Sequence, residues 1–167
     1  MLKVASFDIV FQEVPGEVTL ALNISGCPNR CPGCHSPHLR DDIGEPLTAE
    51  LISDLIARYS PGITCVCFMG GDQDPDEVAR LAAYVKAQGL KTAWYSGQTS
   101  TTREPLPASP QGEGNRWAEF DFVKVGPYVE ALGGLKSPTT NQRFYRREGS
   151  NWIDDTARFQ RKPSSKL

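Results

Sequence analysis

The chain has 167 residues, of which 39% are hydrophobic and 23% charged, and its formal net charge is -2. This length fits one domain, and the hydrophobic fraction is ordinary for a globular protein with a real core. The charge gives no broad basic surface for nucleic acid, and no hydrophobic run reaches the ~18 residues of a membrane span.

The amino-terminal residues 1–8 do not have the layout of a secretion signal, because polar and acidic residues interrupt them early. We therefore expect the protein in the cytoplasm. Three of the five cysteines fall within eight residues. This clustering differs from the disulfide framework of secreted proteins and is more typical of a metal-binding or catalytic group in a reducing compartment.

Strands are indicated by hydrophobic and β-branched runs, and helices by hydrophobic residues at i, i+3, i+4 and i+7. Thr48 and Asp74 are the expected N-caps of two helices, and Gly89 suits the position just after the second. In chain order we expect an edge strand or arm over 2–13, a strand over 17–25, a helix over 48–59, a strand over 63–69, a helix over 74–88, and strands over 90–95 and 120–125.

The second half of the chain is less regular. Residues 98–117 are polar and carry prolines and glycines near their centre, which predicts a surface loop. Residues 143–147 and 152–153 predict a short closing hairpin. We expect residues 1–157 to form the domain and the basic residues 158–167 to form a disordered tail.

The order of these elements predicts an α/β fold with a largely parallel sheet and helical crossovers. In such folds the active site forms at the carboxyl ends of the strands. Each of the four core strands is followed by a distinctive segment, and we expect these segments to meet at one edge of the sheet: 27–34, Gly70-Gly71-Asp72, Ser96-Gly97 and Gly126-Pro127.

The first segment contains Cys27, Cys31 and Cys34 in the spacing C-x3-C-x2-C. Fe–S clusters usually take four cysteine thiolates. A loop with three can hold three irons of a cubane cluster and leaves the fourth iron for another ligand. The alternative is zinc, which wants four ligands in a structural site and could take the fourth from a nearby histidine or cysteine.

Three further residues are candidates for that fourth zinc ligand, namely His35, Cys65 and Cys67. Cys65 and Cys67 lie two positions apart on a predicted strand, so both face the same side of it. We favour small buried hydrophobic residues as their role, because free cysteine is often buried. His35 is expected to be a polar neighbour of the cysteine loop, without a catalytic role.

The cysteine loop after the first core strand and the Gly-Gly-acid turn after the second resemble the radical S-adenosylmethionine superfamily. In that superfamily three cysteines hold a [4Fe–4S] cluster, and S-adenosylmethionine binds the open iron through its amino and carboxylate groups. One electron from the cluster cleaves the sulfonium to methionine and a 5′-deoxyadenosyl radical. The resemblance implies that Cys27, Cys31 and Cys34 hold the cluster, and that Gly70, Gly71 and Asp72 bind S-adenosylmethionine.

The resemblance extends to one group in the superfamily, the activating proteins of anaerobic ribonucleoside-triphosphate reductase. It implies an incomplete (β/α) barrel, a glycyl radical generated on the large subunit of that reductase, and a flavodoxin- or ferredoxin-type electron donor. The similar segments, besides the cysteine loop, are 13–17, 67–72, 95–97, 123–128 and 139–143.

Three more residues are expected in the S-adenosylmethionine pocket. Ser96 and Gly97 would line its nucleoside part, and Lys124 would pair with a ligand carboxylate. The alternatives are a simple turn for the first two and an exposed side chain for the lysine. Asp72 stands where the family usually has glutamate, and it could instead cap the following helix. No catalytic residue is expected beyond the cluster ligands.

Three other functions remain open at this level. The chain could activate another glycyl-radical enzyme, such as pyruvate formate-lyase, or act as a radical enzyme on a small molecule. Outside catalysis, it could be a zinc-binding interaction module. The segment 139–143 favours the reductase activases, and the iron, sulfide and zinc content separates the enzymes from the zinc module.

Overall fold

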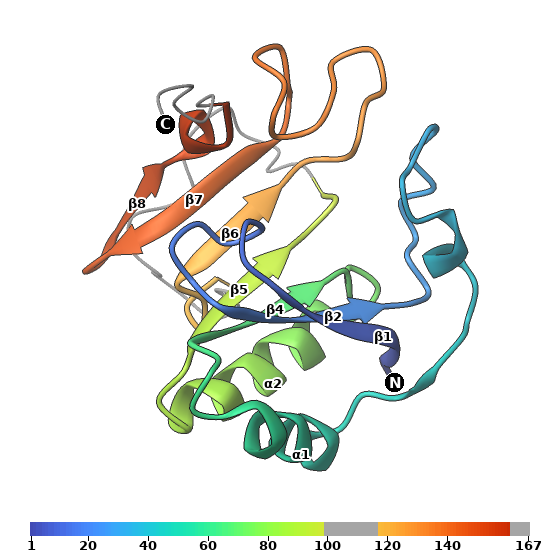
Figure 1. Ribbon diagram of the computed structural model, residues 1–167. Coiled ribbons are helices and arrows are strands. Elements are labelled where there is room, and N and C mark those ends of the chain that lie inside the picture. The colour runs from blue at the N-terminus through green and yellow to red at the C-terminus, as the bar shows by residue number, and fades with distance from the viewer. Residues whose placement is uncertain (99–116, 161–167) are drawn as a thin grey trace, which may run out of the picture.

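A mixed sheet, with eight strands among the described residues, lies at the centre of the protein (Figure 1). The computed structural model describes residues 1–98 and 117–160. Across the sheet the strands follow the order β3-β1-β2-β4-β5-β6-β7-β8. Their bounds are β1 Lys3–Val10, β2 Thr19–Ile24, β3 Glu45–Pro46, β4 Cys65–Met69, β5 Lys91–Tyr95, β6 Phe122–Val125, β7 Arg143–Glu148 and β8 Asn151–Asp154.

The four central strands β2, β4, β5 and β6 run parallel to one another. The strands on either side are antiparallel to their neighbours: β1 and β3 at one edge, β7 and β8 at the other. The parallel part arises because α1, Ala49–Tyr59, and α2, Pro75–Ala87, each return the chain to the start of the next parallel strand. The carboxyl ends of these four strands therefore lie at one edge.

The two helices begin where the sequence predicts. The Thr48 side chain accepts a hydrogen bond from the Leu51 N–H at 3.1 Å, and the Asp74 side chain accepts one from the Glu77 N–H at 3.3 Å. These bonds satisfy backbone donors that have no partner within the first turn. Both helices cover the same face of the sheet (Figure 1). They bury their hydrophobic stripes there: Ile52, Leu55 and Ile56 from α1, and Val78, Leu81, Ala82 and Val85 from α2.

The sheet has a second, smaller hydrophobic core on its other face. It contains Cys65, Cys67, Ala93 and Phe144, together with Val14 from the turn before β2. No α-helix among the described residues packs here. The face is covered instead by irregular segments and by η2, a 3-10 helix over Thr156–Gln160, whose Phe159 ring packs on Phe144 with centroids 4.9 Å apart.

The predicted incomplete (β/α) barrel with a largely parallel sheet is wrong. In the described residues only two α-helices occur, and four of the strands pair antiparallel at the two edges. The reason is the nature of the connections. β1 and β2 form a hairpin around Pro15-Gly16, and the segment 126–142 between β6 and β7 contains prolines and glycines that prevent a crossover helix.

The closing hairpin is confirmed as β7 and β8, and it extends the sheet beyond β6. The predicted surface loop over 98–117 falls almost wholly outside the described residues. η2 runs through the position where the disordered tail is expected to begin, and the Gln160 amide donates to the Ser137 backbone oxygen at 2.9 Å. The rest of that tail, 161–167, also lies outside the described residues. Within 1–98 and 117–160, the helices are too short and polar to cross a membrane.

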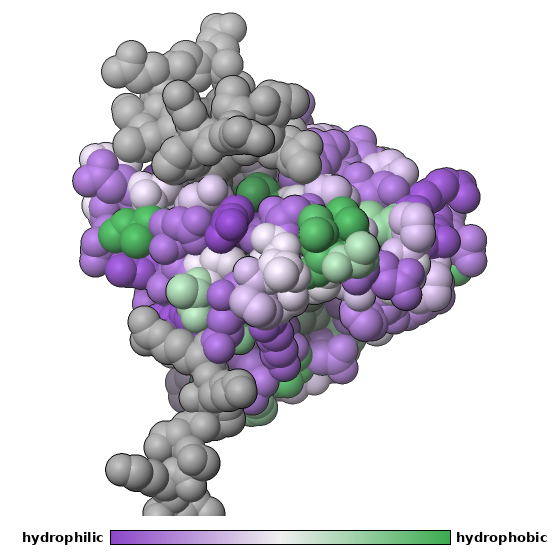
Figure 2. All heavy atoms as spheres, turned by 90° about the horizontal axis from the view of Figure 1, so that it is seen from above, coloured by the Kyte–Doolittle hydropathy of each residue, from purple (hydrophilic) through white to green (hydrophobic). Residues whose placement is uncertain are grey.

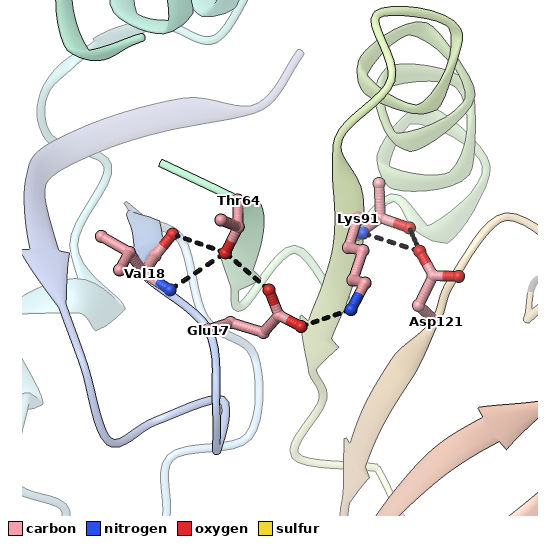
Figure 3. Close-up of polar contacts among 6 residues, drawn as sticks. Glu17, Val18, Thr64, Lys91 and Asp121 are labelled. Carbon is pink, nitrogen blue, oxygen red and sulfur yellow. Dashed lines mark hydrogen bonds and ion pairs between the residues drawn. The ribbon is translucent and has the colours of Figure 1, made fainter. Parts of the chain in front are cut away.

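A polar network ties the amino ends of the four parallel strands together (Figure 3). Glu17 accepts a hydrogen bond from the Thr64 hydroxyl at 2.5 Å and forms an ion pair with Lys91 at 2.5 Å. Asp121, just before β6, accepts a hydrogen bond from the Thr92 N–H at 3.0 Å. The network therefore joins segments that start β2, β4, β5 and β6.

Candidate functional site

The cysteine loop, residues 27–34, leaves the carboxyl end of β2 as the sequence predicts. Its start is fixed by backbone hydrogen bonds from Gly26 N–H to Asp41 O at 3.1 Å and from Cys27 N–H to Leu39 O at 2.9 Å. Within the loop, Gly33 has φ +74° and Arg30 has φ 46°. These left-handed conformations reverse the chain between the cysteines.

The three thiols of the loop are half-buried and free. Two of them accept hydrogen bonds: the Ser36 N–H lies 3.4 Å from Cys34 Sγ, and Asn29 Nδ2 lies 3.6 Å from Cys27 Sγ. Among the described residues no three His, Cys, Asp or Glu side chains are grouped closely enough to hold a metal ion. Binding a cluster therefore requires the loop to draw its thiols together.

Asp72, in the turn after β4, connects three of the predicted strand-end segments. Its Oδ1 accepts a hydrogen bond from the Ser96 hydroxyl at 2.5 Å. Its Oδ2 accepts bonds from the Gly97 N–H at 2.8 Å and from Asn29 Nδ2 at 2.6 Å. The side chain is buried. Asp72 does not cap α2, since that position belongs to Asp74.

The two glycines before Asp72 have positive φ values, +109° for Gly70 and +93° for Gly71. Both are also closely packed. A Cβ on Gly70 would lie 3.1 Å from the Ile24 backbone oxygen, and one on Gly71 would lie 2.5 Å from Val78 Cγ2. The turn therefore needs glycine to bring β4 close to β2 and α2, whether or not a ligand approaches it.

Lys124 on β6 is buried, although an exposed lysine was the alternative expectation. Its ammonium group donates to the Ser96 backbone oxygen at 3.1 Å and to the Gly126 backbone oxygen at 3.2 Å. It also lies 5.6 Å from the centre of the Tyr95 ring. Burial lowers the pKa of Lys124 from 10.5 to about 8, while the negative charge of Asp72 acts in the opposite direction.

A cavity of about 600 Å³ opens beside these strand ends. A methionine, an aromatic ring and a buried ammonium group all reach it, next to one thiol of the cysteine loop. The cavity is also bounded by the segment between β6 and β7. Its walls include Cys34, Met69, Tyr95, Lys124, Tyr128 and Gln142. The site thus combines a cluster-type loop, a cation and a hydrophobic wall around one space.

The structure brings the predicted site residues together at one edge. Cys27, Asp72, Ser96, Gly97 and Lys124 are linked by the contacts above, either directly or through Asn29. Gly97 packs against Asn29 and Asp72, and a Cβ at this position would lie 2.4 Å from Asn29 Nδ2. The glycine therefore has a packing role in addition to the predicted one of lining a nucleoside pocket.

Asn29 is the residue that sequence reasoning missed, because a polar residue in a loop is normally expected to face solvent. It is half-buried and donates to Asp72 and Cys27. Its position between two cysteines of one motif is the signal that could have identified it. His35 contacts the Tyr128 ring, with ring centres 5.2 Å apart.

Cys65 and Cys67 lie in the core, as predicted, and both are fully buried on β4. Burial raises the pKa of both thiols well above the ordinary value. Cys67 Sγ lies 3.4 Å from Met69 Sδ. These two cysteines stay neutral thiols within a hydrophobic cluster, which leaves them poorly suited to complete a metal site on the loop.

Half-buried thiols with N–H donors, on a loop at the strand ends of an α/β sheet, are the features of an iron–sulfur protein. Over residues 14–139 the chain matches the family described as the 4Fe-4S single cluster domain, and it belongs to that family. Neither the curated proteins nor the solved structures contain a match to the chain. The family supports a [4Fe–4S] cluster, and the donor chemistry of the cysteine loop fits one.

Proposed function

We propose that the protein cleaves S-adenosylmethionine reductively and uses the product to generate a glycyl radical on anaerobic ribonucleoside-triphosphate reductase. One observation carries this proposal. Asp72 hydrogen-bonds to the cysteine loop through Asn29 and to the next strand end through Ser96 and Gly97. The segments that the radical S-adenosylmethionine resemblance assigns to cluster and ligand are therefore in direct contact, and two of the assigned residues, Cys34 and Lys124, line the neighbouring cavity.

Cys27, Cys31 and Cys34 would hold three irons of the cluster, and the loop leaves the fourth iron open to the ligand. The bound cluster supplies one electron, received from a flavodoxin- or ferredoxin-type donor, to break a carbon–sulfur bond of the sulfonium. The role of the loop would be to gather its three thiols around the cluster at the carboxyl ends of the strands.

Lys124 would bind the carboxylate of S-adenosylmethionine. It lines the cavity, and its ammonium group donates to two backbone oxygens; among the described residues no carboxylate hydrogen-bonds to it, so a ligand carboxylate could do so. Burial has removed water from this ammonium group and lowered its pKa, so a bound carboxylate would stabilise the charged form and raise the pKa of Lys124 again. Met69 and Tyr95 supply hydrophobic walls beside it.

Asp72 would bind the amino group with what remains of its hydrogen-bonding capacity. A carboxylate can accept about four hydrogen bonds, and three donors already use this one. The amine would take the remaining position or replace one of these donors. Gly70 and Gly71 would bring the backbone of the same turn close to the ligand.

The partner glycine would approach at the strand-end edge. Two exposed hydrophobic residues, Val129 and Leu132, lie on the segment between β6 and β7, which also forms part of the cavity wall. Seen from above, the surface carries several small hydrophobic patches among hydrophilic residues (Figure 2). Patches of this kind suit a transient protein partner, whose docking would exclude water from the radical step.

The test is anaerobic reconstitution with iron and sulfide, chemical reduction, and incubation with S-adenosylmethionine and the large subunit of the reductase. We expect 5′-deoxyadenosine by mass spectrometry and a glycyl radical by electron paramagnetic resonance. Pyruvate formate-lyase in place of the reductase tests the other activase function. Zinc without sulfide in the purified protein would contradict the proposal.

A further inference from the structure

We propose that Asn29 is a positioning residue for the cluster: it fixes the Cys27 sulfur by an N–H···S hydrogen bond and holds the cysteine loop to the sheet edge. This inference rests on the assignment of Cys27 as a cluster ligand. It adds a residue that lies between the ligands and is not itself one.

The geometry uses both hydrogens of one amide group. Asn29 Nδ2 lies 2.6 Å from Asp72 Oδ2 and 3.6 Å from Cys27 Sγ. The first contact is a short hydrogen bond to a charged acceptor, which is stronger than a bond between neutral groups. The second has the length of a hydrogen bond to sulfur. The carboxylate therefore anchors the amide, and the amide directs its other hydrogen at the thiolate.

The surroundings of the amide allow little movement. Asp72 is itself held by the Ser96 hydroxyl and the Gly97 N–H. Gly97 has no side chain, and this makes room for Asn29, because a Cβ at that position would lie 2.4 Å from Nδ2. The carboxylate, the amide and the glycine thus form one unit that joins the ends of β4 and β5 to the loop.

Asparagine meets this need where related side chains do not. Aspartate has the same shape but cannot donate, and it would place a second negative charge against Asp72. Serine has one hydrogen and cannot serve both acceptors. Alanine removes both bonds and leaves the buried Asp72 oxygen with one donor fewer.

A hydrogen bond to a ligand sulfur affects the cluster in a defined direction. The donor stabilises the more negatively charged, reduced state, so hydrogen bonds to the sulfurs raise the reduction potential. Loss of the Asn29 donor should make the cluster harder to reduce. Loss of the anchor to Asp72 should also release the loop and let the cluster dissociate faster.

The experiment compares Asn29→Ala with Asn23→Ala in the reconstituted protein. Asn23 is a matched control, because it is a half-buried asparagine on β2 whose side chain also donates to an aspartate, Asp8, at 3.3 Å. Three quantities are measured: iron and sulfide per chain, the rate at which a chelator removes iron, and the potential from a redox titration followed by electron paramagnetic resonance.

We expect Asn29→Ala to lose iron about 10-fold faster than the wild type and to have a more negative potential, while Asn23→Ala matches the wild type. A folded Asn29→Ala that binds no cluster also supports the inference, provided that Asn23→Ala binds one. An unchanged iron-release rate together with an unchanged potential would overturn it. Circular dichroism establishes that each variant is folded.

Gly97→Ala provides a second route if Asn29→Ala does not fold. The added methyl group displaces the amide without removing it, so the same faster iron release and lower potential are expected. A wild-type protein that takes up no cluster would contradict the proposed function itself. A wild-type cluster that Gly97→Ala and Asn29→Ala leave unaltered would contradict only the role of Asn29.

Discussion

The ammonium group of Lys124 lies 3.1 Å from the backbone oxygen of Ser96, and this contact joins β6 to the turn that follows β5. The lysine is buried and has no carboxylate within hydrogen-bonding distance among the described residues. Burying a cation without such a partner costs free energy, and that cost depends on pH.

Lys124 should therefore make the protein more stable as the pH rises. Its pKa is about 8 in the folded protein, against an ordinary 10.5. Between these values the unfolded chain holds a proton that the folded chain has released, so the free energy of unfolding increases with pH, by up to about 3 kcal/mol. Urea unfolding of the cluster-free protein from pH 7.5 to 10.5 measures this rise, and Lys124→Met should show less of it. Parallel curves for the two proteins would contradict the prediction.

The three loop cysteines and the two core cysteines should respond differently to substitution. Alanine at Cys27, Cys31 or Cys34 should each prevent binding of the [4Fe–4S] cluster and abolish formation of 5′-deoxyadenosine. Alanine at both Cys65 and Cys67 should leave the cluster in place and reduce stability by about 1–3 kcal/mol through lost packing. Iron and sulfide content per chain is the measurement. Loss of iron in the double variant would contradict the prediction and indicate that the core cysteines are cluster ligands.

Asp72→Asn should weaken the strand-end edge. An amide offers one oxygen where the carboxylate offers two, so at least one of the three donors loses its acceptor. We expect a loss of about 1–3 kcal/mol in the free energy of unfolding and weaker binding of S-adenosylmethionine. Asp74→Asn is the control two residues away, because asparagine caps a helix as well as aspartate does. If the two variants were equally stable, the prediction that Asp72 stabilises this edge as a shared acceptor would be wrong.

Glu17→Gln should destabilise the amino-end network without changing the cluster. The Glu17 carboxylate side chain is 9% exposed and contacts both Thr64 and Lys91. We expect the free energy of unfolding to fall by about 1 kcal/mol, which is at the upper end of the range for partly exposed ion pairs. The exposed pair between Glu77 and Arg80 on α2 is the comparison; Glu77→Gln should cost less than ~0.5 kcal/mol. Chemical denaturation measures both values. A larger loss of stability in Glu77→Gln than in Glu17→Gln would contradict the stabilising role of the amino-end network.

Local patterns in the sequence predicted most of the elements. The caps Thr48 and Asp74, the helix stripes and the runs that form β2, β4, β5 and β6 depend on neighbours a few residues apart, so periodicity reveals them. The barrel prediction failed for a different reason. It followed from a family resemblance, whereas the antiparallel edges depend on how the connections before β2 and after β6 turn, which their prolines and glycines govern.

One part of the candidate site could be predicted from the sequence, because active sites form at the carboxyl ends of parallel strands. That rule brought Asp72 and Ser96 to one edge, and the structure agrees. It could not show that Asn29 meets Asp72, because the two are 43 positions apart in the chain and the contact depends on the path of the loop. The left-handed conformation of Arg30 helps to set that path, and arginine is not a residue type that predicts such a conformation.

The parallel strands are held by polar contacts at both ends, through Glu17 at one edge and Asp72 at the other. Because side chains alternate between the two faces of a sheet, a slip of one strand by one residue would exchange its helix-facing residues with those of the other core. The two networks make such a slip costly, since it would break contacts at both edges. Strand register therefore controls where the cysteine loop sits, and the two networks together keep the loop at the carboxyl ends of the strands.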